Sequence, residues 1–263
     1  MKHISICIST YEMGGKAAGF LAYNFESLMR QTFKDFDVVV SDQSKDDVVK
    51  KICEKYGNRL DIRYFRNKDY GNQDANINNA IRNATGRLIK ILFLDDYLYG
   101  DEALEKIAKA FDLERDRWLI TGCACTRDDA TFERKIVPRY DDATILFKNR
   151  IGAPSVVTVR NDDPVLFDEA LSACGDVDYY KRSFDRFGQP KVMPEINVII
   201  RLHPLQVTNT TATESARERE FRIILKKYSI PNAGRRLLAY RLRRYERQFK
   251  SLVKMALGMK TLA

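Results

Sequence analysis

Two adjacent carboxylates, Asp95 and Asp96, follow the apolar run ILFL at residues 91–94. Neighbouring negative charges repel each other unless a cation or hydrogen-bond donors compensate them. Hard divalent ions such as Mg²⁺ or Mn²⁺ take one or two carboxylates together with phosphate oxygens of a substrate. The pair therefore predicts a metal site that handles a phosphorylated substrate. The alternative is an N-cap for the helix that follows, since Asp often begins a helix.

The segments around this pair alternate between strand and helix patterns over residues 1–125. Runs rich in β-branched residues indicate strands, and apolar residues at three- and four-residue spacing indicate the helices between them. This alternation predicts a parallel sheet covered by helices on both faces. The expected strands are 3–9, 36–41, 61–65, 88–94 and 117–124, and the expected helices are 18–30, 45–56, 73–84 and 102–111.

Polar side chains follow the first two expected strands, as Ser9-Thr10-Tyr11-Glu12 and Ser41-Asp42-Gln43-Ser44. Ligands of open α/β sheets bind beyond the carboxyl ends of the strands. We therefore expect these side chains to meet Asp95 and Asp96 at one edge. The chain has no GxGxxG after its first strand and no GxxxxGK[ST], so neither a dinucleotide-binding fingerprint nor a P-loop is supported.

The pattern changes after Thr126. Short strands near 132–137 and 155–160 precede a helix at 177–187 and a strand at 192–203. We expect antiparallel strands here that extend the sheet and shape a second half of the site. From Glu214 onward the sequence becomes Arg-rich and helical.

Six segments occur in order over about residues 3–208: ISICISTYE, LMRQTFKDFDVVVSDQSKDD, GNQDANINNAIRNATGRLIKILFLDDYLY, IGAPSVVTVR, CGDVDYYKR and IIRLHPLQVT. Taken together they resemble the inverting family 2 glycosyltransferases of the GT-A fold, of bacterial type. The chain lacks the QxxRW signature of processive synthases, so the resemblance is to non-processive members. It implies a Rossmann-like, mostly parallel α/β sheet flanked by helices, with a small antiparallel acceptor-side part and a C-terminal helical extension.

The resemblance implies roles for residues on the nucleotide side. Thr10, Glu12 and Asp42 fall where the family contacts the base and ribose, and a carboxylate suits the ring N–H of uracil or thymine. Asn76 falls in the stretch that lines the nucleotide pocket, with a plain helix-surface position as its alternative.

The acidic motif of the family falls on Asp95 and Asp96. We expect Asp96 to be the direct metal ligand, for Mn²⁺ or Mg²⁺, and Asp95 to serve the ribose. Phe93 stands where the family has the first Asp of its DxD pattern, so one carboxylate is missing. His203 falls at the family's position near the diphosphate and the metal, with a structural hydrogen bond as its alternative.

On the acceptor side the resemblance implies that Asp176 is the catalytic base. Such a carboxylate takes the proton of the acceptor hydroxyl as the oxygen attacks the anomeric carbon; the alternative for Asp176 is an N-cap. Asp178 is a second candidate, with a solvated or capping carboxylate as its alternative. Gly152, Pro154 and Ser155 resemble an acceptor-facing turn, although Gly and Pro also serve in ordinary turns.

The charge of the chain is concentrated in its last fifth. The whole chain has 45 Lys+Arg and 36 Asp+Glu, a net charge of +9, of which residues 214–263 hold 14 basic and 4 acidic residues. The remaining 31 basic and 32 acidic residues make residues 1–213 nearly neutral. The charge of the whole chain is therefore no argument for nucleic-acid binding, and we expect no nucleic-acid partner.

Cysteine usage and hydropathy limit the class of protein further. Five scattered cysteines without a CxxC pair predict neither a zinc cluster nor a disulfide framework. No segment approaches the roughly 20 apolar residues of a membrane-spanning helix, and the N-terminus does not resemble a secretory signal. These patterns predict a cytoplasmic enzyme, with a peripheral position on the inner face of the cytoplasmic membrane as an option for its basic C-terminal segment.

That segment carries an amphipathic pattern. Cations fall largely off one apolar stripe, which predicts either contact with an anionic membrane surface or packing on the catalytic domain or a second copy through residues 232–263. The stripe consists of Leu238, Leu242, Tyr245, Phe249, Leu252, Val253 and Ala256. We therefore expect a catalytic domain at 1–213, with a nucleotide half at 1–125 and an acceptor half at 126–213, followed by an extension at 214–263.

The expected function is transfer of a sugar from a nucleoside-diphosphate sugar, of UDP or dTDP type, to a hydroxyl of a glycan or lipid-linked acceptor in polysaccharide biosynthesis. Two alternatives stay open at this point. A sugar nucleotidyltransferase would also use a nucleotide, Mg²⁺ and acidic residues. Such an enzyme normally has a Gly-rich loop with Lys or Arg after its first strand, and Gly14-Gly15-Lys16 resembles that loop only faintly. A non-catalytic protein could use the basic segment to bind an anionic surface.

Overall fold

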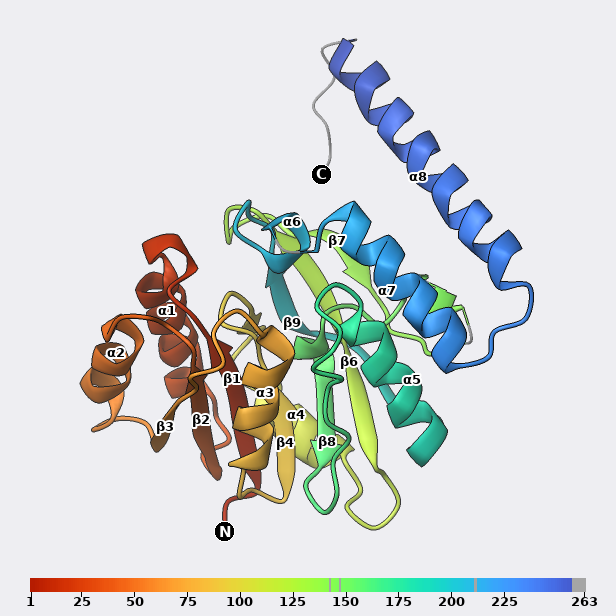
Figure 1. Ribbon diagram of the computed structural model, residues 1–263. Coiled ribbons are helices and arrows are strands. Elements are labelled where there is room, and N and C mark those ends of the chain that lie inside the picture. The colour runs from red at the N-terminus through yellow and green to blue at the C-terminus, as the bar shows by residue number, and fades with distance from the viewer. Residues whose placement is uncertain (142, 147, 211, 257–263) are drawn as a thin grey trace. The chain divides into compact units, whose positions relative to one another are not determined.

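The structure, a computed structural model, describes residues 1–141, 143–146, 148–210 and 212–256 (Figure 1). After Ala212 the chain divides into two compact units. Within the described residues, no helix is both long enough and apolar enough to cross a membrane.

The first unit is built on one nine-stranded sheet in the order β3-β2-β1-β4-β8-β6-β9-β5, with β7 paired to β6. Six strands run in one direction, and β5, β7 and β8 oppose them. The predicted α/β class with a mostly parallel sheet is therefore confirmed. The strands are β1 Ile4–Thr10, β2 Phe36–Asp42, β3 Ile62–Arg66, β4 Leu88–Ile91, β5 Tyr97–Leu98, β6 Trp118–Thr126, β7 Glu133–Ile136, β8 Val157–Arg160 and β9 Lys191–Arg201.

Helices connect these strands and cover the sheet. α3 packs across β1 and β2, and α1 packs against α2 and β5 (Figure 1). The helices are α1 Ala17–Arg30, α2 Val48–Tyr56, α3 Gln73–Arg82, α4 Ala103–Ala110, α5 Gly175–Phe187 and α6 Val207–Thr210, with single 3₁₀ turns at Met13–Gly15, Thr144–Leu146 and Pro154–Val156.

The core lies in the central strands. Ile6 in β1, Val39 in β2 and Ile89 in β4 are fully buried, and so are their neighbours on both sides along each strand. Successive side chains of a strand point to opposite faces of the sheet. Burial on both faces is typical of parallel strands in the middle of a sheet, and it explains why the predicted strands agree with the observed ones to within a few residues.

Parallel registry brings the polar ends of the strands together. Thr10 at the end of β1 lies opposite Asp42 at the end of β2. β4 pairs with β1 on its other side and ends at Ile91, shorter than predicted, because the chain turns so that the Asp96 N–H donates to the Phe93 carbonyl at 3.1 Å. This turn delivers Asp95 and Asp96 to the same edge.

One expectation for the second half is wrong. β7 and β8 are antiparallel additions, as predicted, but β9 is parallel to β6 and antiparallel to β5. The two-residue strand β5, which was not predicted, supplies the antiparallel edge instead. β9 thus ends on the same side as β1 and β2, which carries Arg201 and His203 toward the site.

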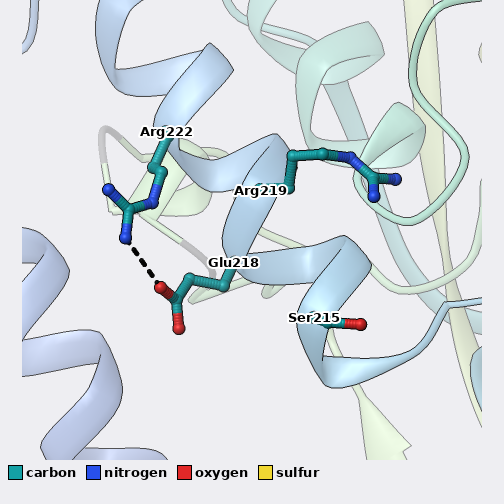
Figure 2. A pocket seen from close by; sticks show the side chains of 4 residues that line it. All are labelled: Ser215, Glu218, Arg219 and Arg222. Carbon is teal, nitrogen blue, oxygen red and sulfur yellow. Dashed lines mark hydrogen bonds and ion pairs between the residues drawn. The ribbon is translucent and has the colours of Figure 1, made fainter.

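The second unit is a helical hairpin. α7, Glu214–Lys227, begins at Thr213, whose side chain accepts the N–H of Ala216, and α8 spans Ala233–Ala256. Tyr240 of α8 is buried, with its ring 5.2 Å from that of Phe221. Figure 2 shows a shallow pocket along α7 lined by Ser215, Glu218, Arg219 and Arg222, in which Arg222 donates to Glu218 at 2.9 Å.

Close packing of β6 on β9 requires glycine at position 122. The register of the two strands shifts at Gly122, and a Cβ there would lie 2.4 Å from the Pro194 carbonyl oxygen. We expect Gly122→Ala to lower the free energy of unfolding by about 1–3 kcal/mol, the usual cost of overpacking. Gly19→Ala is the matched control, because it adds a methyl to open space on α1 and should be neutral or stabilising. Urea denaturation of both variants measures the difference, and equal effects would contradict the packing argument.

Candidate active site

Asp42 lies at the end of β2 with its carboxylate fully buried. One oxygen accepts the Ser44 N–H at 2.8 Å and the Thr10 hydroxyl at 3.3 Å, and the other accepts the Tyr64 hydroxyl at 2.7 Å. Desolvation and this contact with Asp42 raise the pKa of Tyr64 well above its ordinary value. Thr10 and Asp42, both predicted site residues, therefore lie together. Tyr64, on the neighbouring strand β3, covers the Asp42 carboxylate.

Asn76 joins the ends of β1 and β2. Its amide donates to the Thr10 carbonyl at 2.9 Å, and its carbonyl oxygen accepts the Ser41 hydroxyl at 2.7 Å. The side chain is buried, so the alternative of a helix-surface position is wrong. Glu12 lies just beyond β1, partly buried, and its backbone carbonyl accepts the N–H of Gly15 at 2.9 Å.

His203 pairs with Asp95 and not with Asp96. The His203 Nε2 lies 2.9 Å from the Asp95 Oδ2, and both side chains are largely buried. Asp96 is buried beneath them and accepts the Ser155 hydroxyl at 2.5 Å. The grouping therefore differs from the prediction, which combined Asp96 with His203. The turn after β4 thus gives the two adjacent carboxylates different partners, His203 for Asp95 and Ser155 for Asp96.

Lys90 is a second buried charged residue near Asp96. This lysine of β4 is fully buried and donates to the Ser155 carbonyl. Burial lowers the pKa of Lys90 to about 7, and the negative charge of Asp96 opposes that shift. Burial and the neighbouring Asp95 raise the pKa of Asp96, while the Ser155 hydroxyl lowers it. The predicted Ser155 thus lies between a buried acid and a buried base, as a positioning group.

Arg201, which was quoted within the motif IIRLHPLQVT but given no role, lies in an aromatic box. Its guanidinium carbon is 5.3, 4.2 and 4.5 Å from the ring centres of Phe20, Tyr23 and Tyr97. Its nitrogens donate to the Asp95 carbonyl at 3.1 Å and to the Asp129 carboxylate at 2.8 Å. One buried cation therefore connects the Asp95 turn to α1, β5 and the loop after β6.

Asp176 lies in the first turn of α5, partly buried. Its Oδ2 accepts the Asn149 amide at 3.0 Å, and its Oδ1 accepts the N–H of Val177 at 2.8 Å. The neighbouring Gly175 lets Asp74 approach closely, since a Cβ there would lie 2.0 Å from the Asp74 Oδ2. The helix start is thereby held in place, and the carboxylate of Asp176 has a defined orientation.

The remaining acceptor-side residues divide into two groups. Gly152 accepts the Tyr180 hydroxyl at 2.9 Å and the Asn149 amide at 3.0 Å through its carbonyl, and Pro154 is buried in the 3₁₀ turn that follows. Asp178, in contrast, is fully buried and paired with Arg182 at 2.8 Å. The carboxylate of Asp178 forms a buried ion pair, so its role is structural and differs from that expected for Asp176.

A divalent metal ion at this site would take its ligands from these side chains. Among the described residues, no three His, Cys, Asp or Glu side chains form a group that could hold a metal by themselves. Asp95 and His203 offer a carboxylate and an imidazole 2.9 Å apart, and a carboxylate suits Mn²⁺ or Mg²⁺. The pair fits a metal whose other ligands come from a bound diphosphate.

Fold and site together define an α/β protein of the GT-A type, with carboxylates beyond its strand ends. The chain belongs to glycosyl transferase family 2, whose sequence family matches residues 5–155, more than half of the chain.

Three known proteins illustrate this similarity. An uncharacterized glycosyltransferase, RP339 of Rickettsia prowazekii, is 22% identical over 228 residues, which are 80% of this chain and 67% of that protein. S. aureus TarS residues 1–349 in complex with UDP-GlcNAc superpose with a TM-score of 0.68 at 19% identity, covering 86% of this chain and 64% of that one. The mannosyltransferase PcManGT from Pyrobaculum calidifontis, in complex with GDP-Man and Mn²⁺, gives 0.58 at 13% identity, over 86% and 64%. The chain thus spans slightly less than two thirds of the two solved structures.

The aromatic box leads to a prediction for Arg201. Lysine keeps the charge but loses the planar donor fork and the stacking of a guanidinium. We expect Arg201→Lys to loosen the Asp95 turn and to raise the KM for the donor roughly tenfold or more, the effect of about 1.4 kcal/mol. Arg127→Lys is the control, because Arg127 pairs with Glu133 near the surface. Steady-state kinetics with varied donor concentration measure the change, and an unaltered KM in Arg201→Lys would remove it from donor positioning.

Proposed function

We propose that the chain transfers a sugar from a nucleoside-diphosphate sugar to a hydroxyl group of a glycan or lipid-linked acceptor, with inversion at the anomeric carbon. The observation that carries the proposal is the segment 149–155. Asn149 donates to Asp176 at one end of it, and Ser155 donates to Asp96 at the other. A single short stretch thus couples the proposed base to the acidic turn.

Asp176 acts in this reaction as the general base. Its carboxylate accepts the proton of the acceptor hydroxyl while that oxygen forms a bond to the anomeric carbon from the face opposite the leaving group. The bond between the anomeric carbon and the diphosphate oxygen breaks, and the nucleoside diphosphate leaves with the electron pair. The amide of Asn149 fixes the orientation of the base.

A UDP- or dTDP-type donor is favoured. Support comes from the pairing of Asp42 with Thr10 at the strand ends and from the nucleotide in the TarS structure, which is UDP-GlcNAc. A carboxylate has about four lone-pair positions, so Asp42 retains acceptor capacity for the N–H of a pyrimidine ring. Because Tyr64 donates to the same carboxylate, a base that reaches Asp42 competes with this hydroxyl.

Asp95 and His203 would hold a divalent ion, Mn²⁺ or Mg²⁺. When bound, the ion supplies positive charge to the diphosphate as negative charge develops on the leaving group. The Mn²⁺ in the PcManGT complex supports this assignment. Asp96 would not be a metal ligand in this proposal, because it is buried and accepts the hydroxyl of Ser155.

Replacing the proposed base should separate chemistry from binding. Asp176→Asn keeps the size of the side chain but cannot accept the proton, so we expect kcat to fall at least ~100-fold with the donor affinity retained. Asp185→Asn, on the exposed end of the same helix, is the control and should keep its rate. Release of nucleoside diphosphate measures the reaction, and release of pyrophosphate would indicate a nucleotidyltransferase. A near-normal kcat in Asp176→Asn would exclude this residue as the base.

Two variants distinguish the adjacent carboxylates. Asp95→Asn removes the charge that faces His203, so we expect Mn²⁺ to lose most of its effect on the thermal shift caused by UDP, and the Mn²⁺ concentration for half activity to rise ~10-fold. Asp96→Asn should keep the Mn²⁺ effect, since its side chain contacts Ser155. Differential scanning fluorimetry with UDP, with and without Mn²⁺, tests both. The opposite pattern would return the ligand role to Asp96.

A further inference from the structure

Helix α8 carries a row of exposed apolar side chains. Leu238, Leu242, Tyr245 and Phe249 are 56%, 60%, 64% and 68% exposed. Their spacing of four, three and four residues places them on one face of a helix with 3.6 residues per turn. We call these four residues the α8 row. Leu252, Val253 and Ala256, which would continue the predicted stripe, and residues 257–263 lie outside the side chains that the structure describes.

The α8 row is not the surface by which α8 packs on α7. That surface is made by Tyr240, which is 4% exposed, and by Arg241, whose guanidinium lies 2.5 Å from the Glu218 carboxylate. The hydroxyl of Tyr240 also donates to Glu214 at 3.3 Å. The hairpin therefore closes through one side of α8 and leaves the row on another.

Cations accompany the row. α8 contains eight Lys or Arg residues and one Glu. Glu218 binds both Arg222 and Arg241, and these two guanidinium groups hold the pKa of Glu218 at about 2. Arg235 and Arg243 are exposed. The helix that carries the row is thus strongly basic, because the acidic side chains of the hairpin are too few to neutralise its cations.

We propose that α8 binds an anionic lipid surface, with the α8 row inserted among the acyl chains and the flanking arginines at the headgroups. Large apolar side chains on one face of a basic helix suit the boundary between headgroups and acyl chains, where each part finds its preferred surroundings. Long cationic side chains reach the headgroups while their aliphatic parts stay apolar. Each cation near such a surface strengthens binding about fivefold.

A second copy of the chain fits the α8 row less well. The four side chains offer roughly 500 Å² of apolar surface, whereas a stable interface buries about 800 Å² on each partner. In a two-fold symmetric dimer both copies use the same surface patch, so two strongly basic α8 helices would be brought side by side. An anionic surface removes that repulsion, and a protein copy does not.

Vesicle flotation of the full chain tests the proposal without any donor or activity measurement. The probes are vesicles of phosphatidylcholine alone and vesicles with equal parts phosphatidylglycerol. We expect binding to the anionic vesicles and a much weaker association with the neutral ones, with a steep loss on adding salt. Failure to bind the anionic vesicles, or equal binding to both, overturns the proposal and leaves the transferase reaction untouched.

Three variants locate the binding surface. Leu242→Ser combined with Phe249→Ser should weaken binding to anionic vesicles roughly 100-fold, about tenfold for each apolar side chain withdrawn. Arg235→Gln combined with Arg243→Gln should weaken it roughly 25-fold at low salt. Ile223→Ser is the control, because Ile223 is 43% exposed on α7 and outside the row.

Thermal unfolding shows that the variants are folded, which is expected because all the replaced side chains are exposed. Unchanged binding of both double variants overturns the proposal. So does a dimer, seen by light scattering, that the row variants dissociate without changing vesicle binding. That result would assign the α8 row to a second copy of the chain.

Discussion

Charges buried beneath the carboxyl edge of the sheet must each be compensated by the protein, because an unpaired buried charge costs several kcal/mol. Asp42 is compensated by the Ser44 N–H, the Tyr64 hydroxyl and the Arg66 guanidinium 3.6 Å away, and Asp96 by Ser155. These partners come from more than one loop or strand. The hydrogen bonds that compensate these charges therefore hold the loops around the site in place. The loops in turn position the residues that would contact a substrate.

Arg201 shows how this constraint joins the two halves of the first unit. Arg201 is the last residue of β9 and is 6% exposed. The partners of its guanidinium come from α1, β5 and the turn that carries Asp95. Aromatic faces supply attraction for the cation without adding negative charge. Arg201 donates to the backbone carbonyl of Asp95 and forms its ion pair with Asp129. The carboxylate of Asp95 therefore stays available to His203.

Much of this arrangement can be derived from sequence, and the remainder depends on turns. The strands containing Ile6, Val39 and Ile89 follow from runs rich in β-branched residues, and parallel order then places Thr10 opposite Asp42. Which partner each of the two adjacent carboxylates contacts does not follow, because the turn closed between Asp96 and Phe93 decides it. Asp178 lies two residues from Asp176 in the sequence, yet it is fully buried and pairs with Arg182 on the next turn of α5.

The missing carboxylate at position 93 changes how charges balance in the proposed reaction. Phe93 packs against the core, and its N–H donates to Ser155 at 2.9 Å, so position 93 serves the turn. Among the described residues, Asp95 is the carboxylate that pairs with His203, and a single negative charge does not neutralise a divalent ion. The diphosphate of the donor has to supply the rest. Metal and donor are therefore expected to bind as a linked pair, since each supplies the charge that the other lacks.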